Sequence, residues 1–158
     1  MTQDLILAYT RRITMANKTQ MITILYEMIL DYISEGERKL EEGDEKGFAE
    51  ELSKSMNCID ELIHSLNLGY ELGKNLLSLY IFEKGQILKS IAKRSKDDLT
   101  HVKKTFDSLH EAYLKLEEQN KEEALMTNVP KVYVGLTYGK SRLTESVSDN
   151  YTSRGYMA

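Results

Sequence analysis

The sequence predicts an all-α fold: an antiparallel four-helix bundle with a short N-terminal segment and a flexible C-terminal tail. Three observations lead to this prediction. At 158 residues, the chain is long enough for one domain with a sizeable core. One proline, no tryptophan and 29% charged residues are more typical of a helical protein than of a sandwich or barrel. Apolar residues also recur every three or four positions in four long segments, each bounded by a capping residue or a glycine.

Local sequence signals define the N-terminal segment and the helix that follows it. Leu5–Thr14 combines apolar residues with Arg11–Arg12, and we expect a short helix or turn there. Asn17 can cap the next helix, since Gln20 lies three residues further on and can complete a capping box. We expect this helix to run to about Glu42, where Gly43, a residue typical of the position after a helix C-terminus, ends it.

Three further helices are predicted. Asp44 caps the third helix, which we expect to end near Leu68. The fourth spans Glu71–Lys93, and Ser95 or Asp97 caps the fifth. Short connections between long helices favour antiparallel neighbours, which gives the predicted bundle.

We therefore divide the chain into an N-terminal segment (1–16), a helical bundle (17–120) and a flexible tail (121–158). After Asn120 the sequence contains the only proline and is rich in glycine, serine, threonine and asparagine, with no helical period. Within the tail, residues 132–136 alternate between large aliphatic residues and other types. This pattern leaves three interpretations open: a short strand, an arm docked on the bundle, or a recognition peptide.

Composition excludes several classes of function. A net charge of −4 and an isoelectric point near 5.5 argue against nucleic-acid binding, which needs a cationic face. No apolar run reaches the length of about 18 residues that membrane insertion requires, and the start of the chain lacks the basic residues of a signal peptide. The single cysteine, Cys58, fits a reducing compartment. We expect a cytoplasmic protein that does not insert into membranes.

The second and fourth helices carry more apolar surface than one core contact needs. Apolar residues cover roughly 240° of the second helix at about 100° per residue, whereas a stripe of little more than about 100° suffices for one interface. Two interpretations stay open: these helices are the most buried pair, or their extra surface forms binding grooves. The candidate groove residues are Ile22, Tyr26, Ile29, Ile33, Leu77, Tyr80, Leu88 and Ile91.

The two tyrosines, Tyr26 and Tyr80, are the strongest candidates for binding. They are large and rigid, and each can form a hydrogen bond at the edge of a groove. The N-terminal segment supplies a candidate cover for such a groove. Its apolar residues, Leu5, Ile6, Leu7 and Tyr9, could occupy the groove while no partner is bound.

No enzyme motif or cofactor site stands out. Glu61 and His64 match the Glu-x-x-His spacing of di-iron bundles, but both face away from the apolar side of their helix, and no second such motif occurs. His64 also lacks the sequence context of a phosphotransfer histidine. We interpret His64, His101 and His110 as surface residues, and we expect no catalytic residue, metal or cofactor.

Several stretches together resemble one known family. They are Ala8-Tyr9, the apolar run Met21–Glu27 ending in Leu-Tyr-Glu, the segment Asn57–Leu62 followed by Ser65-Leu66, and the segment Asn75–Tyr80. In this order and spacing they resemble the FliS family of flagellar export chaperones. The resemblance extends from about Leu5 to Glu118.

The resemblance implies a fold and a function. FliS-like proteins are antiparallel helical bundles that bind the C-terminal segment of flagellin in the cytoplasm. They prevent its premature polymerisation and support its delivery to the flagellar export apparatus, without a cofactor. A homodimer is kept open as an oligomeric state. Two alternative functions also stay open: a helical adaptor for another protein, and a histidine phosphotransfer bundle, which the outward histidines disfavour.

Overall fold

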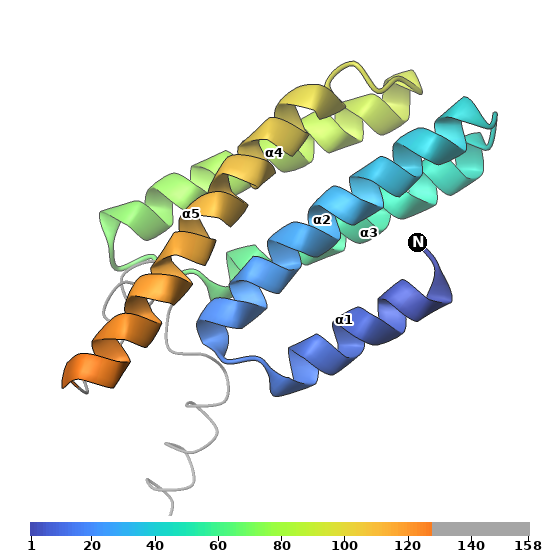
Figure 1. The fold of residues 1–158 in the computed structure, drawn as a ribbon. Coiled ribbons are helices and arrows are strands. Elements are labelled where there is room, and N and C mark those ends of the chain that lie inside the picture. Colours follow the sequence, from blue (N-terminus) through green and yellow to red (C-terminus); the bar gives the residue numbers. More distant parts are fainter. Residues whose placement is uncertain (128–158) are drawn as a thin grey trace, which may run out of the picture.

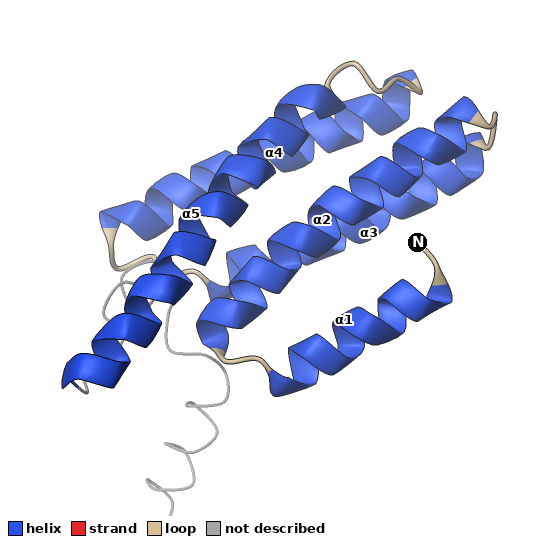
Figure 2. Cartoon of the chain, in the orientation of Figure 1, coloured by secondary structure: helices blue, strands red, loops and turns tan. Residues whose placement is uncertain are grey.

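The computed structural model describes the backbone of residues 1–127 and the side chains of residues 1–121. The described part of the chain consists of helices joined by short connections, without a strand (Figure 2). This confirms the predicted all-helical fold for these residues. The helices are α1 (Gln3–Met15), α2 (Lys18–Glu41), α3 (Glu45–Ser65), α4 (Glu71–Lys93) and α5 (Leu99–Thr127).

The helix starts predicted at Asn17 and Asp44 are confirmed, whereas α5 begins at Leu99 and the predicted cap at Ser95 or Asp97 stays a prediction. The Asn17 side chain accepts a hydrogen bond from the Gln20 backbone at 2.9 Å, and the Gln20 side chain accepts one from the Asn17 backbone at 3.0 Å. Asp44 caps α3 by accepting a hydrogen bond from the Gly47 backbone at 2.8 Å. Between α2 and α3, Gly43 has φ 81°, which a residue without a Cβ adopts at low cost.

Three boundaries differ from the prediction. Of the two predicted alternatives for the N-terminal segment, the structure has the helix, and it extends beyond Leu5–Thr14 at both ends. Helix α3 ends at Ser65, about one turn before the predicted end. Helix α5 continues beyond Asn120 to Thr127, so the first residues of the predicted tail are helical. The alternating segment of residues 132–136 lies outside the described residues.

Helix α2 lies at the centre of the arrangement. It packs against α1 on one side and against α3 and α5 on others, while α4 packs against α3 and α5 (Figure 1). The described residues thus form five helices, where the sequence indicated four long helices and a short segment. The antiparallel four-helix arrangement stays a prediction, with α1 as an additional helix on the outside of α2.

Aromatic side chains join α2, α4 and α5 in the core. The hydroxyl groups of Tyr26 and Tyr80 lie 2.5 Å apart and share a hydrogen bond in the buried interior. The Tyr26 ring packs against Phe106 and Tyr113 of α5, and the Tyr80 ring stacks on Phe106. The hydroxyl groups of Tyr26 and Tyr80 are therefore buried but still hydrogen-bonded, and the rings of the two tyrosines fill the space between three helices.

We predict that the hydrogen bond between Tyr26 and Tyr80 stabilises the bundle measurably. Tyr26→Phe should lower the free energy of unfolding by about 1 kcal/mol, the usual net value of a buried hydrogen bond. Tyr80→Phe should act similarly. The double variant should lose less than the sum of the two single losses, because both single variants remove the same bond. Urea denaturation of the four proteins measures this coupling, and strictly additive losses would contradict it.

Candidate functional site

Most of the predicted groove residues lie in the core. Ile22, Tyr26, Ile29, Ile33 and Tyr80 are each no more than 1% exposed. The reason is the central position of α2, whose broad apolar surface is covered by its three neighbours. These residues therefore do not line an open groove in this structure. Their role in binding stays a prediction.

The other three candidates lie together on α4. Leu88 is 52% exposed, while Leu77 and Ile91 are partly exposed. Ile81, which the sequence analysis did not select, is 57% exposed. At about 100° per residue, these four positions fall within about 80° of the helix circumference. We call them the α4 stripe: Leu77, Ile81, Leu88 and Ile91.

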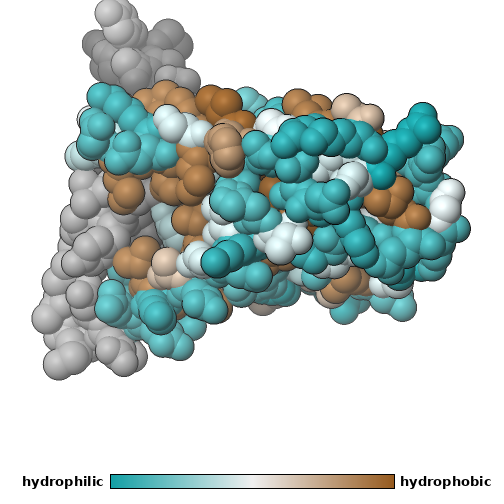
Figure 3. Space-filling model, turned by 90° about the horizontal axis from the view of Figure 1, so that it is seen from above, coloured by the Kyte–Doolittle hydropathy of each residue, from teal (hydrophilic) through white to brown (hydrophobic). Residues whose placement is uncertain are grey.

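The α4 stripe is separate from the buried face of the same helix. That face packs Leu76, Tyr80 and Ile87 into the core. On the opposite flank, Leu72 and Phe82 are exposed as well, and the Phe82 ring meets His101 of α5 edge-on. Figure 3 shows that hydrophobic side chains form patches between hydrophilic ones on one face of the molecule. Helix α4 thus exposes more apolar surface than a solvated helix face requires.

The predicted cover, α1, lies on α2 and not on the α4 stripe (Figure 1). Of its apolar residues only Tyr9 is buried, whereas Leu5, Ile6 and Leu7 are exposed. The helix is therefore not attached mainly by an apolar face. The groove-cover role of Leu5, Ile6 and Tyr9 stays a prediction. If α1 acts as a cover, the surface that it covers belongs to α2.

Polar contacts attach α1 instead. The Tyr9 hydroxyl donates a hydrogen bond to Asp31 at 2.5 Å. Burial and this acidic partner raise the pKa of Tyr9 above its ordinary value. Arg12 forms an ion pair with both carboxylate oxygens of Glu27. Burial of Glu27 acts to raise its pKa, but hydrogen bonds from Arg12 and His110 outweigh it, and the pKa is lowered.

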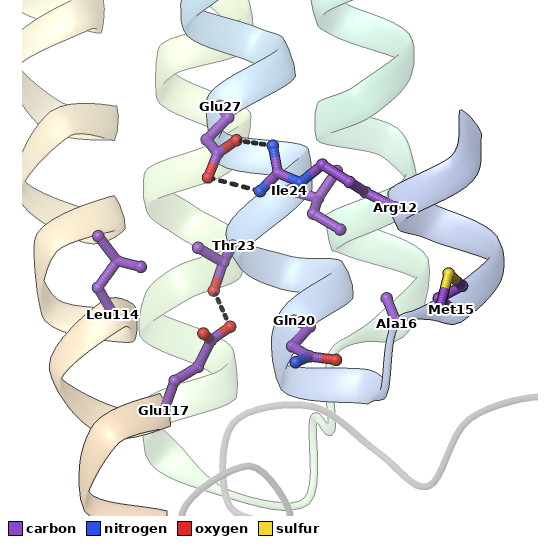
Figure 4. Close-up of a pocket in the computed structure, with 9 residues that line it drawn as sticks. All are labelled: Arg12, Met15, Ala16, Gln20, Thr23, Ile24, Glu27, Leu114 and Glu117. Carbon is purple, nitrogen blue, oxygen red and sulfur yellow. Dashed lines mark hydrogen bonds and ion pairs between the residues drawn. The ribbon is translucent and has the colours of Figure 1, made fainter. Parts of the chain in front are cut away.

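A cleft of about 410 Å³ opens where α1, α2 and α5 meet. Figure 4 shows the ion pair of Arg12 and Glu27 at one side of it and a hydrogen bond from Thr23 to Glu117, 2.7 Å long, at another. Apolar groups complete the lining. They are Met15 and Ala16 at the end of α1, Ile24 of α2 and Leu114 of α5.

The histidines are placed partly as predicted. His64 and His101 are exposed, and His101 contacts the buried Glu83 at 3.3 Å. The prediction of a surface position is wrong for His110, which is partly buried and lies 3.2 Å from Glu27, because α5 packs this side against α2. Among the described residues, no group of three or more histidine, cysteine and acidic side chains is arranged to hold a metal ion. Burial also raises the pKa of Cys58 to about 12, so its thiol stays protonated near neutral pH.

Comparison with protein families identifies the chain. The model of the family described as "Flagellar protein FliS" matches residues 7–120, which include α1 from its second turn, helices α2 to α4, and α5 as far as residue 120. This chain belongs to the FliS family. Comparison with curated individual proteins finds no match.

Membership of the FliS family makes the chain a flagellar export chaperone, and this is a family of chaperones rather than of enzymes. The predicted resemblance is confirmed. The match also includes Tyr9 and Arg12, so the C-terminal part of α1 belongs to the family domain. In residues 1–127, no helix combines the length and the apolar character needed to cross a bilayer.

Two features of the site were absent from the sequence interpretation. Ile81 could have been found, because it lies four residues after Leu77 and seven before Leu88, on the same helix face. The contacts of Tyr9 with Asp31 and of Arg12 with Glu27 join different helices. No spacing in the sequence indicates such pairs before the packing of α1 is known.

We predict that the attachment of α1 weakens in acid. Because the pKa of Glu27 is lowered from 4.5, its ion pair with Arg12 stabilises the folded chain above that pH and is lost as the pH falls through the lowered value. Arg12→Gln should therefore lower the melting temperature at neutral pH, and the difference from the native chain should shrink below pH 4.5. Melting curves followed by circular dichroism measure this.

The control for this prediction is Arg11→Gln, which removes the same charge from the neighbouring exposed position. It should change the melting temperature less at neutral pH and show no comparable dependence on acid. A difference between Arg12→Gln and the native chain that stays constant from neutral pH to about pH 3 would contradict the assigned role of the Glu27 carboxylate.

Proposed function

We propose that this FliS-family protein acts in the cytoplasm as the chaperone of the C-terminal segment of flagellin. In this proposal the chaperone keeps the segment from polymerising early and supports its delivery to the flagellar export apparatus. The observation that carries the proposal is the α4 stripe, an exposed apolar surface on a member of an export chaperone family. The partner would be a segment with a matching apolar side, which assembles with other copies of itself when left free.

The form of the α4 stripe supports an amphipathic helix as the ligand. Leu77, Ile81, Leu88 and Ile91 extend along about four turns of α4, a length that another helix can follow with its own apolar residues. One polar side chain interrupts this surface. Lys84 lies between Ile81 and Leu88 on the same helix face and pairs with Asp60 of α3 at 2.5 Å, and such a pair favours a defined orientation of the ligand.

Burial of the α4 stripe supplies part of the binding free energy. Ile81 and Leu88 are about half exposed, so covering each contributes about 1 kcal/mol, roughly half the value for full burial of such a side chain. The remaining free energy has to come from further contacts, since ordering a flexible ligand costs a few kcal/mol. No nucleotide or metal enters this scheme, because burial drives capture and competition at the export apparatus drives release.

Helix α1 fits the role of a removable cover in this proposal. It covers α2 near Ile24, is attached through Tyr9 and Arg12, and leaves Leu5 and Leu7 exposed. The exposed ion pair of Arg12 is individually weak, and Tyr9 is the one buried residue of α1, so α1 can leave at modest cost. Its departure would uncover additional apolar surface of α2 for a long ligand that extends beyond the α4 stripe.

We expect full-length flagellin to bind at about one to one, with micromolar or tighter affinity, and flagellin without its C-terminal segment to bind far more weakly. Isothermal titration calorimetry at several temperatures measures both, and burial of apolar surface should give a negative heat-capacity change. Equal affinity for both forms of flagellin would contradict the proposed ligand. Light scattering of the free chain tests whether a second copy occupies the same surface.

We also expect Ile81→Asp and Leu88→Asp to weaken flagellin binding about tenfold or more each, because a buried charge opposes the contact. Leu72→Asp is the matched control: Leu72 is 50% exposed, nearly as much as Leu88, but lies on the opposite flank of α4. It should leave affinity close to that of the native chain. Equal losses in all three variants would place the ligand elsewhere or show a general effect of charge.

Deletion of residues 1–16 tests the cover. The bundle should remain helical, flagellin affinity should stay equal or increase, and the free protein should self-associate more because apolar surface of α2 is uncovered. Circular dichroism, calorimetry and light scattering give the three readouts. Unfolding would assign α1 to the core. Loss of affinity with an intact fold would instead show that α1 contacts the ligand directly.

A further inference from the structure

The lining of the cleft between α1, α2 and α5 is complementary to a segment that is both apolar and basic. Its walls expose Met15, 87% accessible, and Leu114, 39% accessible, above the buried side chain of Ile24. Two carboxylates, Glu27 and Glu117, lie in the same lining. Arg12 already pairs with Glu27, whereas Glu117 accepts a hydrogen bond from a neutral threonine hydroxyl (Figure 4). The cleft therefore combines apolar contact area with an acidic group that can take a positive charge.

Charge separates the two parts of this chain in a complementary way. Residues 128–158 contain four lysine or arginine residues and two acidic residues, a net charge of +2. Since the whole chain has a net charge of −4, residues 1–127 carry −6. The C-terminal residues are thus attracted to the helical part as a whole, and this attraction acts at the high local concentration that a covalent connection provides.

Chain length selects which of these residues reach the cleft. Helix α5 passes the cleft at Leu114 and Glu117 and ends at Thr127. At about 1.5 Å per helical residue this is a distance of about 15–20 Å. An extended chain covers the same distance in about five or six residues at about 3.3 Å each. The residues that can first return to the cleft are therefore those near position 132.

The sequence at this position matches the lining of the cleft. Lys131 is followed by the alternation of Val132, Val134 and Leu136 with other residue types. In an extended conformation, alternate side chains point to the same side, so the three aliphatic groups would form one apolar edge preceded by a positive charge. Of the three interpretations that the sequence left open, this favours an arm docked on the bundle.

We propose that residues 131–136 of this chain occupy the cleft between α1, α2 and α5, with the aliphatic edge on Ile24 and Leu114 and Lys131 close to Glu117. The occupant is thus the chain's own C-terminal part. Its binding covers the end of α1 and holds it against α2. The inference uses only residues of this chain and does not depend on flagellin as the ligand of the α4 stripe.

Cysteine cross-linking in the full-length chain, without flagellin, tests the proposal. Leu136→Cys is combined with Leu114→Cys at the cleft or, as the control, with Ala112→Cys, an exposed position on another face of α5. A short bismaleimide reagent should join the first pair within one chain several-fold faster than the control pair. The native Cys58 is buried and reacts slowly, and circular dichroism verifies the fold of each variant.

Charge placed in the C-terminal part gives a second matched comparison. In the Leu114→Cys and Leu136→Cys background, Val134→Asp should reduce cross-linking to the control rate, because the charge lies on the aliphatic edge. Thr137→Asp, on the other side of the alternation, should leave cross-linking faster than the control. Equal rates at Leu114 and Ala112 would overturn the proposal, and cross-links only between two chains would show that the occupant is a second copy.

Discussion

The rest of the structure depends on one constraint: the buried hydroxyl groups of Tyr26 and Tyr80 have to stay hydrogen-bonded to each other. These two groups come from α2 and α4 and meet in the buried interior, where rings of α5 pack around them. Because the hydroxyl groups have to remain paired away from water, the two helices are held in one relative position. The broad apolar surface of α2 is covered by its neighbours α3 and α5 and, on one side, by α1.

What remains exposed follows from that arrangement. Helix α4 has fewer covered sides than α2, so the α4 stripe stays at the surface. Helix α1 reaches α2 from outside and depends on polar partners, among them Asp31 and Glu27. The molecule therefore has a rigid interior and two parts that can change their contacts when a client binds. They are the α4 stripe and helix α1, which polar contacts attach. This separation is what a chaperone needs to capture and release a client without unfolding.

Local chemistry allowed much of the fold to be predicted. Asn17 and Asp44 mark helix starts through short-range hydrogen bonds that depend on a few neighbouring residues. The longer α5 was also predictable, since residues 121–126 are mostly strong helix formers, but the glycine-rich sequence further on concealed this. The orientation of Tyr26 was not predictable: apolar residues around a helix do not reveal which side meets a neighbour. The same applies to His110, whose partner lies on another helix.

We expect the client to bind the exposed surface of α4 while the core stays packed. Methyl NMR of the full-length chain, with isoleucine and leucine labelled and the flagellin C-terminal segment added, tests it most directly. We expect large chemical-shift changes for the methyl groups of Ile81 and Leu88 and small ones for Ile29 and Ile33, which lie in the core. Large shifts at Ile29 and Ile33 with unchanged signals from α4 would contradict it, because the client would then bind by opening the bundle.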